Sequence, residues 1–382
     1  MTYIKRILIL EPGPVYQKIS PPYLERIQLF SKELSGDVII GTNTGTCAYP
    51  QIETFNFHCF KLSHYATVLN NILSFVNMLK LSFKLCHNKK NKYSAIISPN
   101  PLITGFVALG IGKLFKIKTV IEVNGDFKEA FKYGPHGEIC LKKADKLKEN
   151  IALKMIAFCL THCDMVKILY ANQLHPLNIP SNKIHASSYF PDFVSVSKFI
   201  NHKKTDGKYI LLIGFPWYLK GVDILIKAFN KISGDFPDYS LKIHGWNPVD
   251  NEYFENLAKN NSRIHLGKAL NYSEVVEVIT ACSIYVLASR TEAMGRVLIE
   301  AMSSCKPIIA SSVGGVSSII KDGFNGLLFE KENVDELAQK LRLLLTDRNL
   351  CEKLAQNGFI YSKEKLSEEC YLQSFVNMID NL

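Results

Sequence analysis

Short apolar segments rich in Ile and Val alternate with longer helical patterns along the whole chain, and this alternation limits the fold more than any other feature. Strands that are apolar nearly throughout are typical of parallel sheets covered by helices on both faces. The chain is therefore predicted to be an α/β protein with doubly wound sheets. The predicted strands are Arg6–Leu10, Val38–Gly41, Ala95–Ser98, Lys118–Val123, Met165–Leu169, Ile184–Ala186, Tyr209–Gly214, Ser240–Gly245, Arg263–Gly267, Ile284–Leu287, Pro307–Ala310 and Gly326–Phe329.

Helical patterns separate these strands, and none of the apolar segments is long enough to cross a membrane. The longest uncharged apolar run, Leu102–Gly112, has about half of the ~20 residues that a spanning helix needs. The first apolar run ends at Glu11 without a cleavage signal, which favours a buried strand over a signal peptide. The predicted helices include Pro22–Leu34, Leu69–Leu85, Val222–Lys231, Asn251–Lys259, Tyr272–Ala281 and Val334–Leu345.

The strand–helix pattern restarts after the polar stretch Asn201–Lys208, which indicates a boundary between two domains. A chain of 382 residues also exceeds what one core normally holds. We predict an N-terminal domain over residues 1–200, a C-terminal domain over 201–360, and a last helix over 361–382 that packs back on the first domain. The cleft between the carboxyl ends of the two sets of strands is the expected ligand site.

Charge and cysteine content limit the partners and the compartment. The net charge of +10 predicts an anionic partner, such as a phosphorylated substrate or an acidic membrane. Nucleic acid is not expected, because neither an aromatic RNA-binding signature nor a recognition helix is visible. The ten cysteines form no CxxC pair, and Cys159 and Cys163 beside His162 have no second ligand pair at zinc spacing. We predict reduced thiols and a cytoplasmic protein.

The segment Ser289–Met302 carries the first chemical signal. The predicted strand Ile284–Leu287 leads into a loop, and Gly295 then opens an amphipathic helix. The free N–H groups at a helix N-terminus bind phosphate, and glycine permits a close approach of the backbone. Glu300 lies roughly 7–8 Å along the helix from Gly295, which suits a carboxylate that binds ribose hydroxyls. Glu292 precedes the helix; taken alone, the two glutamates are more typical of solvated surface groups than of a binding site.

Two further loops follow strands at the same predicted sheet edge. Gly214–Gly221 ends a strand, opens a helix and brings Lys220 close to a helix N-terminus. Lys306–Val316 contains a buried strand that ends in a Gly-Gly loop. Because the carboxyl ends of parallel strands share one edge, the three loops are expected to converge on one anion site.

Gly214–Gly221, Ser289–Met302 and Pro307–Gly326 resemble the donor-site signatures of the retaining glycosyltransferases of family 4, within the glycosyl transferases group 1. This resemblance extends weakly over the rest of the chain. It implies the GT-B fold, in which two Rossmann-like, doubly wound parallel-sheet domains face each other across a cleft. It also implies transfer of a sugar, with retention, from a UDP- or GDP-linked donor to a saccharide or lipid-linked saccharide, for example in bacterial surface polysaccharide synthesis.

The resemblance implies donor-site roles for residues at matching positions. Lys220 would neutralise the donor diphosphate, Glu292 would hydrogen-bond the donor sugar, and Glu300 would hold the ribose. The amides of Met294, Gly295 and Arg296 would cradle phosphate, beside the strand end at Gly214. Backbone around Lys268 and Ala269 would face the base. On the acceptor side, the resemblance implies a loop formed by Gly13 and Pro14, and a catalytic role for Asn124.

Two positions depart from the family's pattern. Phe215 stands where the family usually has an arginine, and Arg296 is a candidate to supply the missing charge. Asn124 stands where the family often has a histidine; asparagine donates a hydrogen bond but cannot act as a base. Leaving-group stabilisation by Lys220 and a helix dipole then has to carry catalysis. No Asp-x-Asp motif follows a strand, so neither a metal nor another cofactor is expected.

Lysines are dense in Leu69–Lys92 and Lys128–Lys154. They are either solvated helix faces or a surface that docks on the anionic inner face of the cell membrane. Other functions remain as alternatives: a catalytically idle GT-B subunit, an epimerase or a phosphorylase. A nicotinamide enzyme is disfavoured, because Glu11-Pro-Gly-Pro-Val15 and not GxGxxG follows the first strand.

Overall fold

The computed structural model describes residues 5–15, 21–42, 44–46, 51–62, 67–127, 143–200, 207–245 and 252–382, with backbone alone for 12–15, 21, 67–70 and 143–145. The chain divides into two compact units. Unit 1 comprises residues 1–124, 146–190 and 372–382, and unit 2 comprises 125–145 and 191–371. The predicted boundary at residue 200 therefore falls inside unit 2, ten residues beyond the end of the second segment of unit 1.

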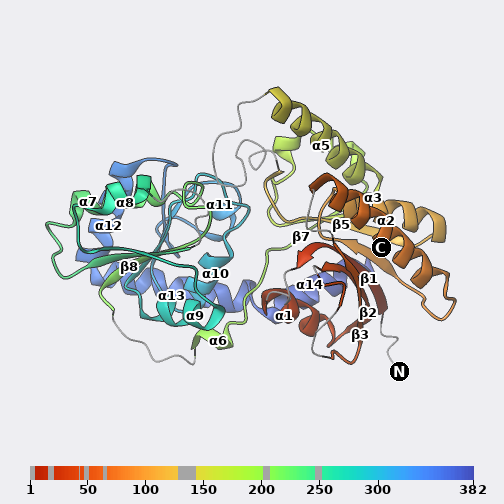
Figure 1. The fold of residues 1–382 in the computed structure, drawn as a ribbon. Coiled ribbons are helices and arrows are strands. Elements are labelled where there is room, and N and C mark those ends of the chain that lie inside the picture. The colour runs from red at the N-terminus through yellow and green to blue at the C-terminus, as the bar shows by residue number, and fades with distance from the viewer. Residues whose placement is uncertain are drawn as a thin grey trace. The chain divides into compact units, whose positions relative to one another are not determined.

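Unit 1 is built on a parallel sheet of seven strands in the order β3-β2-β1-β4-β5-β6-β7 (Figure 1). Strand β1 pairs with β2 on one side and with β4 on the other. Strands β2 and β3 are therefore added on one side of β1, and β4 to β7 on the opposite side. The strands are β1 (Lys5–Val15), β2 (Leu34–Thr42), β3 (Phe55–Lys61), β4 (Ala95–Ser98), β5 (Lys118–Val123), β6 (Met165–Ile168) and β7 (Ser187–Tyr189).

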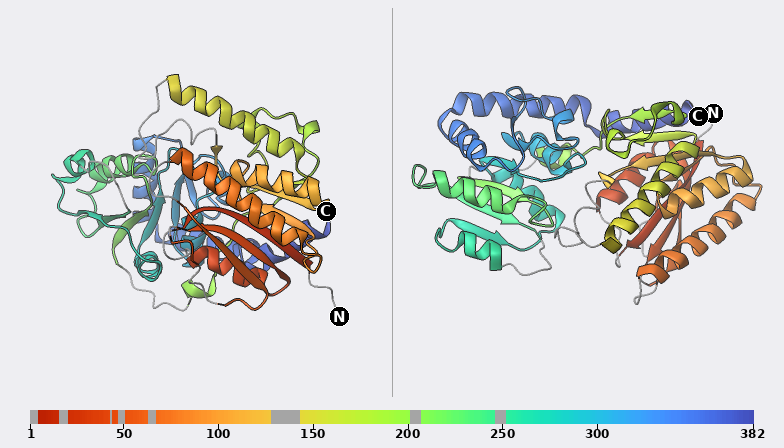
Figure 2. Two further views of the ribbon diagram at one scale, coloured as in Figure 1. Left: turned by 45° about the vertical axis from the view of Figure 1, so that its right-hand side comes forward. Right: turned by 90° about the horizontal axis from the view of Figure 1, so that it is seen from above.

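Helices cover both faces of this sheet (Figures 1 and 2). Helices α2 (Thr67–His87), α3 (Ile103–Phe115) and α5 (Lys143–His162) lie side by side on one face. Helix α1 (Pro21–Phe30) and the C-terminal helix α14 (Glu368–Asp380) meet on the other, where the rings of Phe30 and Phe375 lie 4.2 Å apart.

Unit 2 is built on a second parallel sheet, of six strands in the order β10-β9-β8-β11-β12-β13. Its core joins the sheet to α7 and α12 through fully buried side chains such as Leu212, Phe229 and Leu341. The strands are β8 (Tyr209–Ile213), β9 (Ser240–His244), β10 (Ile264–Gly267), β11 (Ile284–Leu287), β12 (Ile308–Ser311) and β13 (Leu327–Phe329). The helices are α6 (Ser197–Ile200), α7 (Val222–Ile232), α8 (Glu252–Ala258), α9 (Tyr272–Ala281), α10 (Arg296–Ser303), α11 (Val316–Ile319), α12 (Val334–Thr346) and α13 (Arg348–Lys365).

The predicted fold class, an α/β protein with two parallel sheets, is confirmed. Strand β11 and helix α9 have the predicted bounds. A capping box formed by Asn271 and Glu274 fixes where α9 begins. The strand predicted at Ile184–Ala186 is wrong, since the edge strand is Ser187–Tyr189. Strand β3 was not predicted at all.

Cysteine chemistry differs from the prediction at Cys59. Cys59 is disulfide-bonded, so not every thiol is reduced. In the part of the chain that the structure describes, the free thiols are those of Cys86, Cys159, Cys163, Cys282, Cys305, Cys351 and Cys370. Among the described residues, each helix is too short or too polar to span a bilayer.

Candidate functional site

Strands β8 and β11 are neighbours at the centre of the second sheet. From β8 the chain builds β9 and β10 on one side, then crosses back to β11 and builds β12 and β13 on the other. The carboxyl ends of β8 and β11 therefore form a topological switch point, the place where doubly wound sheets bind ligands. The loops over residues 214–221 and 288–295 leave the sheet at this point.

Lys220 and Glu292 meet across the switch point. The Lys220 Nζ lies 2.5 Å from the Glu292 Oε2, and their side chains are only 20% and 13% exposed. The Ser289 hydroxyl donates a second hydrogen bond to the same Glu292 oxygen, at 3.3 Å. Gly214 makes room for the lysine, because a Cβ there would lie 2.8 Å from the Lys220 Cγ. The pair unites a cation and a carboxylate that lie 72 residues apart in the sequence.

The Gly-Gly loop after β12 lies against the same site. The Gly315 amide donates to the Ala293 carbonyl at 2.9 Å, and a Cβ on Gly314 would collide with the Glu292 carbonyl oxygen at 1.8 Å. The loop after β8 contacts the loop after β11 as well, since the Arg290 amide donates to the Leu219 carbonyl at 2.8 Å. The three loops thus converge as the sequence predicted.

Arg290 fixes the loop that carries Lys220. Its guanidinium forms two hydrogen bonds with the Asp223 carboxylate and a third with the Tyr218 carbonyl, at 2.6 Å. Its Nε contacts Glu332 at 2.7 Å. Burial alone would lower the pKa of Arg290, but the hydrogen bonds and the charge of Asp223 outweigh it and raise the pKa above its ordinary value. The guanidinium therefore stays charged.

Helix α10 begins directly after this loop. Gly295, at φ 80°, is the N-cap residue, and no side chain caps the helix. Its first-turn N–H groups and dipole therefore form an N-terminus suited to an anion. Met294 is buried, and its sulfur accepts the Asp192 amide at 3.4 Å. Arg296 lies 3.8 Å from the Asp192 carboxylate.

Glu300 lies one turn further along α10 and is buried. Its Oε1 is 3.7 Å from the Arg296 Nε, so the candidate compensating arginine lies beside the predicted ribose ligand. Beneath the site, the buried Tyr285 hydroxyl donates to the Ile213 carbonyl at 3.3 Å. Burial, with added effects from the charges of Glu300 and Glu292, raises the pKa of Tyr285 well above its ordinary value. Tyr285 is therefore neutral.

The predicted base-contact residues lie at the carboxyl end of β10. Lys268 and Ala269 are exposed there, and the Lys268 carbonyl lies 3.3 Å from the His244 Nδ1 at the end of β9. Burial lowers the pKa of His244, which favours the neutral imidazole. These residues thus share the carboxyl edge of the sheet with Lys220 and Glu292.

The acceptor-side candidates belong to unit 1. Gly13 and Pro14 lie in the last part of β1, in the stretch described by its backbone alone. Asn124 follows β5, and its amide donates to the Glu122 carboxylate at 3.1 Å and to the Pro99 carbonyl at 3.2 Å. The structure therefore brings the donor candidates together in unit 2 and leaves these three in the other unit.

Sequence analysis missed Arg290, Asp223 and Tyr285. Arg290 stands inside the quoted segment Ser289–Met302, but its partner lies 67 residues away and no pattern links the two. A metal centre was not expected, and the described residues contain no group of three or more His, Cys, Asp or Glu placed to bind an ion.

The two parallel-sheet units and the loops at the switch point define an α/β protein of the GT-B class. Residues 195–360 match the family model "Glycosyl transferases group 1". The C-terminal part of the chain is thus a glycosyl transferases group 1 domain.

Similar proteins agree with this assignment. An uncharacterized glycosyltransferase of Methanocaldococcus jannaschii is 36% identical over 46% of this chain and 49% of its own length, so the chain spans about half the length of this curated relative. An N,N'-diacetylbacillosaminyl-diphospho-undecaprenol alpha-1,3-N-acetylgalactosaminyltransferase of Campylobacter jejuni is 25% identical over 74% of this chain and 71% of its own.

Solved structures show the same fold. Sucrose-phosphate synthase from Thermosynechococcus elongatus superposes with a TM-score of 0.76 at 16% identity, over 99% of this chain and 98% of that one. Anabaena Alr3699/HepE in complex with UDP-glucose superposes with a TM-score of 0.73 at 14% identity, over 99% and 100%.

Proposed function

We propose that this protein is a glycosyltransferase of the retaining family 4 type, which moves a sugar from a nucleoside diphosphate to an acceptor hydroxyl. The observation that carries the proposal is the Lys220–Glu292 pair at the switch point of a group 1 domain, next to the N-terminus of α10. A cation and a helix N-terminus together favour a diphosphate.

In the proposed mechanism, the donor diphosphate replaces Glu292 as the ion-pair partner of Lys220. The Glu292 carboxylate then accepts a hydrogen bond from a hydroxyl of the donor sugar. The bond between the anomeric carbon and the phosphate oxygen breaks, and a bond to the acceptor oxygen forms. The acceptor proton leaves with the diphosphate, since Asn124 offers no titratable group. Lys220 and the α10 dipole stabilise the growing negative charge of the leaving group. Arg290 holds the lysine's loop in place.

For the donor we propose a UDP- or GDP-linked sugar, and for the acceptor a saccharide or a lipid-linked saccharide. A UDP-glucose complex of a structural neighbour supports the first. The Campylobacter jejuni relative, whose name gives an undecaprenol-linked sugar as its acceptor, supports the second. The lysine-rich helices of unit 1 support a place at the inner face of the cell membrane.

A catalytically idle subunit is the second candidate, because Phe215 and Asn124 replace residues that the family uses. Thermal shift with a panel of UDP- and GDP-sugars identifies the donor, since a ligand at 100 times its Kd stabilises by about 2.7 kcal/mol. Release of the nucleoside diphosphate from that donor, with and without saccharide acceptors, then separates the candidates. Binding without turnover would favour the idle subunit, and no binding at all would contradict both.

A further inference from the structure

Helix α2 has apolar side chains on two opposite faces. Its inner face packs on the core of unit 1 through Met78, Leu81 and Leu85. Its outer face exposes five further apolar side chains: Ile72, Phe75, Val76, Leu79 and Phe83. Spacings of three and four residues place these five in one stripe along the helix. A helix that is apolar on both faces is expected to be covered on both.

The neighbouring helices extend this apolar surface. The rings of Phe83 and Phe115 lie 5.4 Å apart between α2 and α3, and those of Phe106 and Phe158 lie 5.4 Å apart between α3 and α5. Nine of the fifteen exposed large apolar side chains in the described residues belong to these three helices. The four that α3 and α5 add are Leu114, Leu147, Ile151 and Phe158.

The segment that contains α2 and α3 carries most of the net positive charge of the chain. Residues 54–121 contain nine lysines and no aspartate or glutamate, in a chain whose net charge is +10. Lys80 and Lys84 are exposed beside the apolar stripe of α2. Exposed lysines also follow α2 at Lys89, Lys90 and Lys92 and lie at the end of α3, at Lys113 and Lys116. This layer therefore combines an apolar surface with a strongly cationic one.

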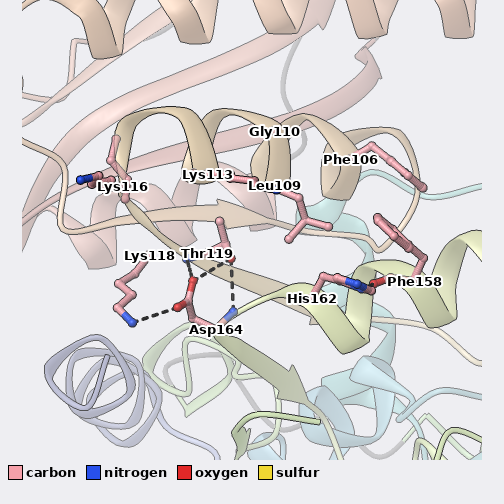
Figure 3. A pocket seen from close by; sticks show the side chains of 12 residues that line it. Phe106, Leu109, Gly110, Lys113, Lys116, Lys118, Thr119, Phe158, His162 and Asp164 are labelled. Carbon is pink, nitrogen blue, oxygen red and sulfur yellow. Dashed lines mark hydrogen bonds and ion pairs between the residues drawn. The ribbon is translucent and has the colours of Figure 1, made fainter. Parts of the chain in front are cut away.

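A cavity of about 680 Å³ opens between α3 and α5 and repeats this combination on a smaller scale (Figure 3). Phe106 and Phe158 face each other at one end of it. Lys116 and Lys118 lie at the other end, where Lys118 pairs with Asp164 at 2.9 Å. Such a hollow suits an amphiphile with an anionic head.

We infer that the layer of α2, α3 and α5 binds the surface of an anionic phospholipid bilayer. The exposed apolar side chains enter the interface, and the lysines lie at the phosphates. Nucleic acid would satisfy the lysines but not the apolar stripe, and a second copy of this layer would repel the first. The inference rests on the membrane location given in the proposed function and specifies the surface that binds. It does not depend on which nucleotide sugar is the donor.

Co-sedimentation of the 382-residue protein with vesicles tests this inference. One set of vesicles contains phosphatidylcholine alone, and the other an equimolar mixture with phosphatidylglycerol. We expect binding to the mixed vesicles that is lost at high salt, and weak binding to the neutral ones. The double variants Lys80→Glu with Lys84→Glu and Ile72→Ser with Leu79→Ser should each weaken it on the order of tenfold or more.

Matched controls lie in unit 2, on α12 and α13. Lys353→Glu with Lys363→Glu makes the same charge change at exposed lysines, and Leu343→Ser with Ile360→Ser removes apolar side chains of similar exposure. Both controls should bind the vesicles as the wild type does. Equal losses of vesicle binding in the test and control variants would overturn the inference. It would also be overturned if light scattering showed a dimer that the variant Ile72→Ser with Leu79→Ser dissociates. Binding of the nucleotide-sugar donor in solution should be unchanged in every variant. A failure of the membrane inference is thereby distinguished from a failure of the proposed glycosyltransferase function.

Discussion

Arg290 and Asp223 face each other through two parallel hydrogen bonds of 2.8 and 2.9 Å, at the junction of the β11 loop with helix α7. Both side chains are buried. The same guanidinium holds the Tyr218 carbonyl, two residues before Lys220. The pair therefore fixes the position of the lysine through the backbone of its loop.

Asp223→Asn should destabilise unit 2 by about 3 kcal/mol, because a buried guanidinium loses its bidentate partner. Urea unfolding followed by tryptophan fluorescence measures this effect, since both tryptophans lie between residues 191 and 371. Asp235→Asn is the control: it breaks an exposed pair with Arg342 and should cost less than about 1 kcal/mol. Equal effects would contradict a bracing role for Asp223.

Lys220→Ala should lower the turnover number about 100- to 1000-fold and leave the fold intact, because it removes one preorganised charge from the leaving group. Steady-state kinetics with the donor identified by thermal shift provide the measurement. Lys231→Ala removes a lysine from an exposed pair with Asp335 and should keep full activity. Near-wild-type transfer by Lys220→Ala would refute its assignment.

The two glutamates of the site should differ in calorimetric titrations with the nucleoside diphosphate. Glu300→Gln should weaken its binding by about 1.5–3 kcal/mol, the usual contribution of a charged hydrogen bond, here to the ribose. Glu292→Gln should retain binding, because it releases Lys220 toward the diphosphate, but it should depress turnover. Equal losses of binding in both variants would refute this division of roles.

The sequence was sufficient to predict the strands and loops that surround Lys220, Glu292 and Gly295, because buried parallel strands are continuous apolar runs. Strand β3 was missed because it lies at the edge of the sheet and is no continuous apolar run: Phe55, Phe57 and Cys59 alternate with Asn56 and His58. Ion pairs between residues far apart in the sequence could not be predicted either. Nothing in the spacing of Lys220 and Glu292, 72 residues apart, indicated that they touch.

Stability should fall as the pH rises from about 5 to about 8, in part through Glu11. Burial raises the pKa of Glu11 to about 7, with a further increase from the charge of Glu122 that Arg26 opposes. The folded state therefore binds a proton that the unfolded state has already released, and this stabilisation is lost as the pH passes 7. Thermal unfolding by circular dichroism should show a flatter pH profile for Glu11→Gln. Parallel profiles for the two proteins would contradict the shift.

Exhaustive chelation with EDTA should leave transfer unchanged, because Lys220 and the α10 N-terminus are proposed to supply the positive charge that a divalent ion supplies elsewhere. The assay compares initial rates before and after dialysis against the chelator. Loss of activity that magnesium restores would refute a metal-independent mechanism.

Helix α14 starts in unit 2 and ends in unit 1, and its Phe375 is fully buried against Phe30 and Phe190. The N-terminal unit is therefore not a continuous piece of the polypeptide. The sheet of unit 1 is fully covered on that face only after residues 372–382 have been synthesised. A fragment truncated at residue 190 would leave both rings exposed to water, and it should aggregate unless the terminal helix is supplied separately as a peptide.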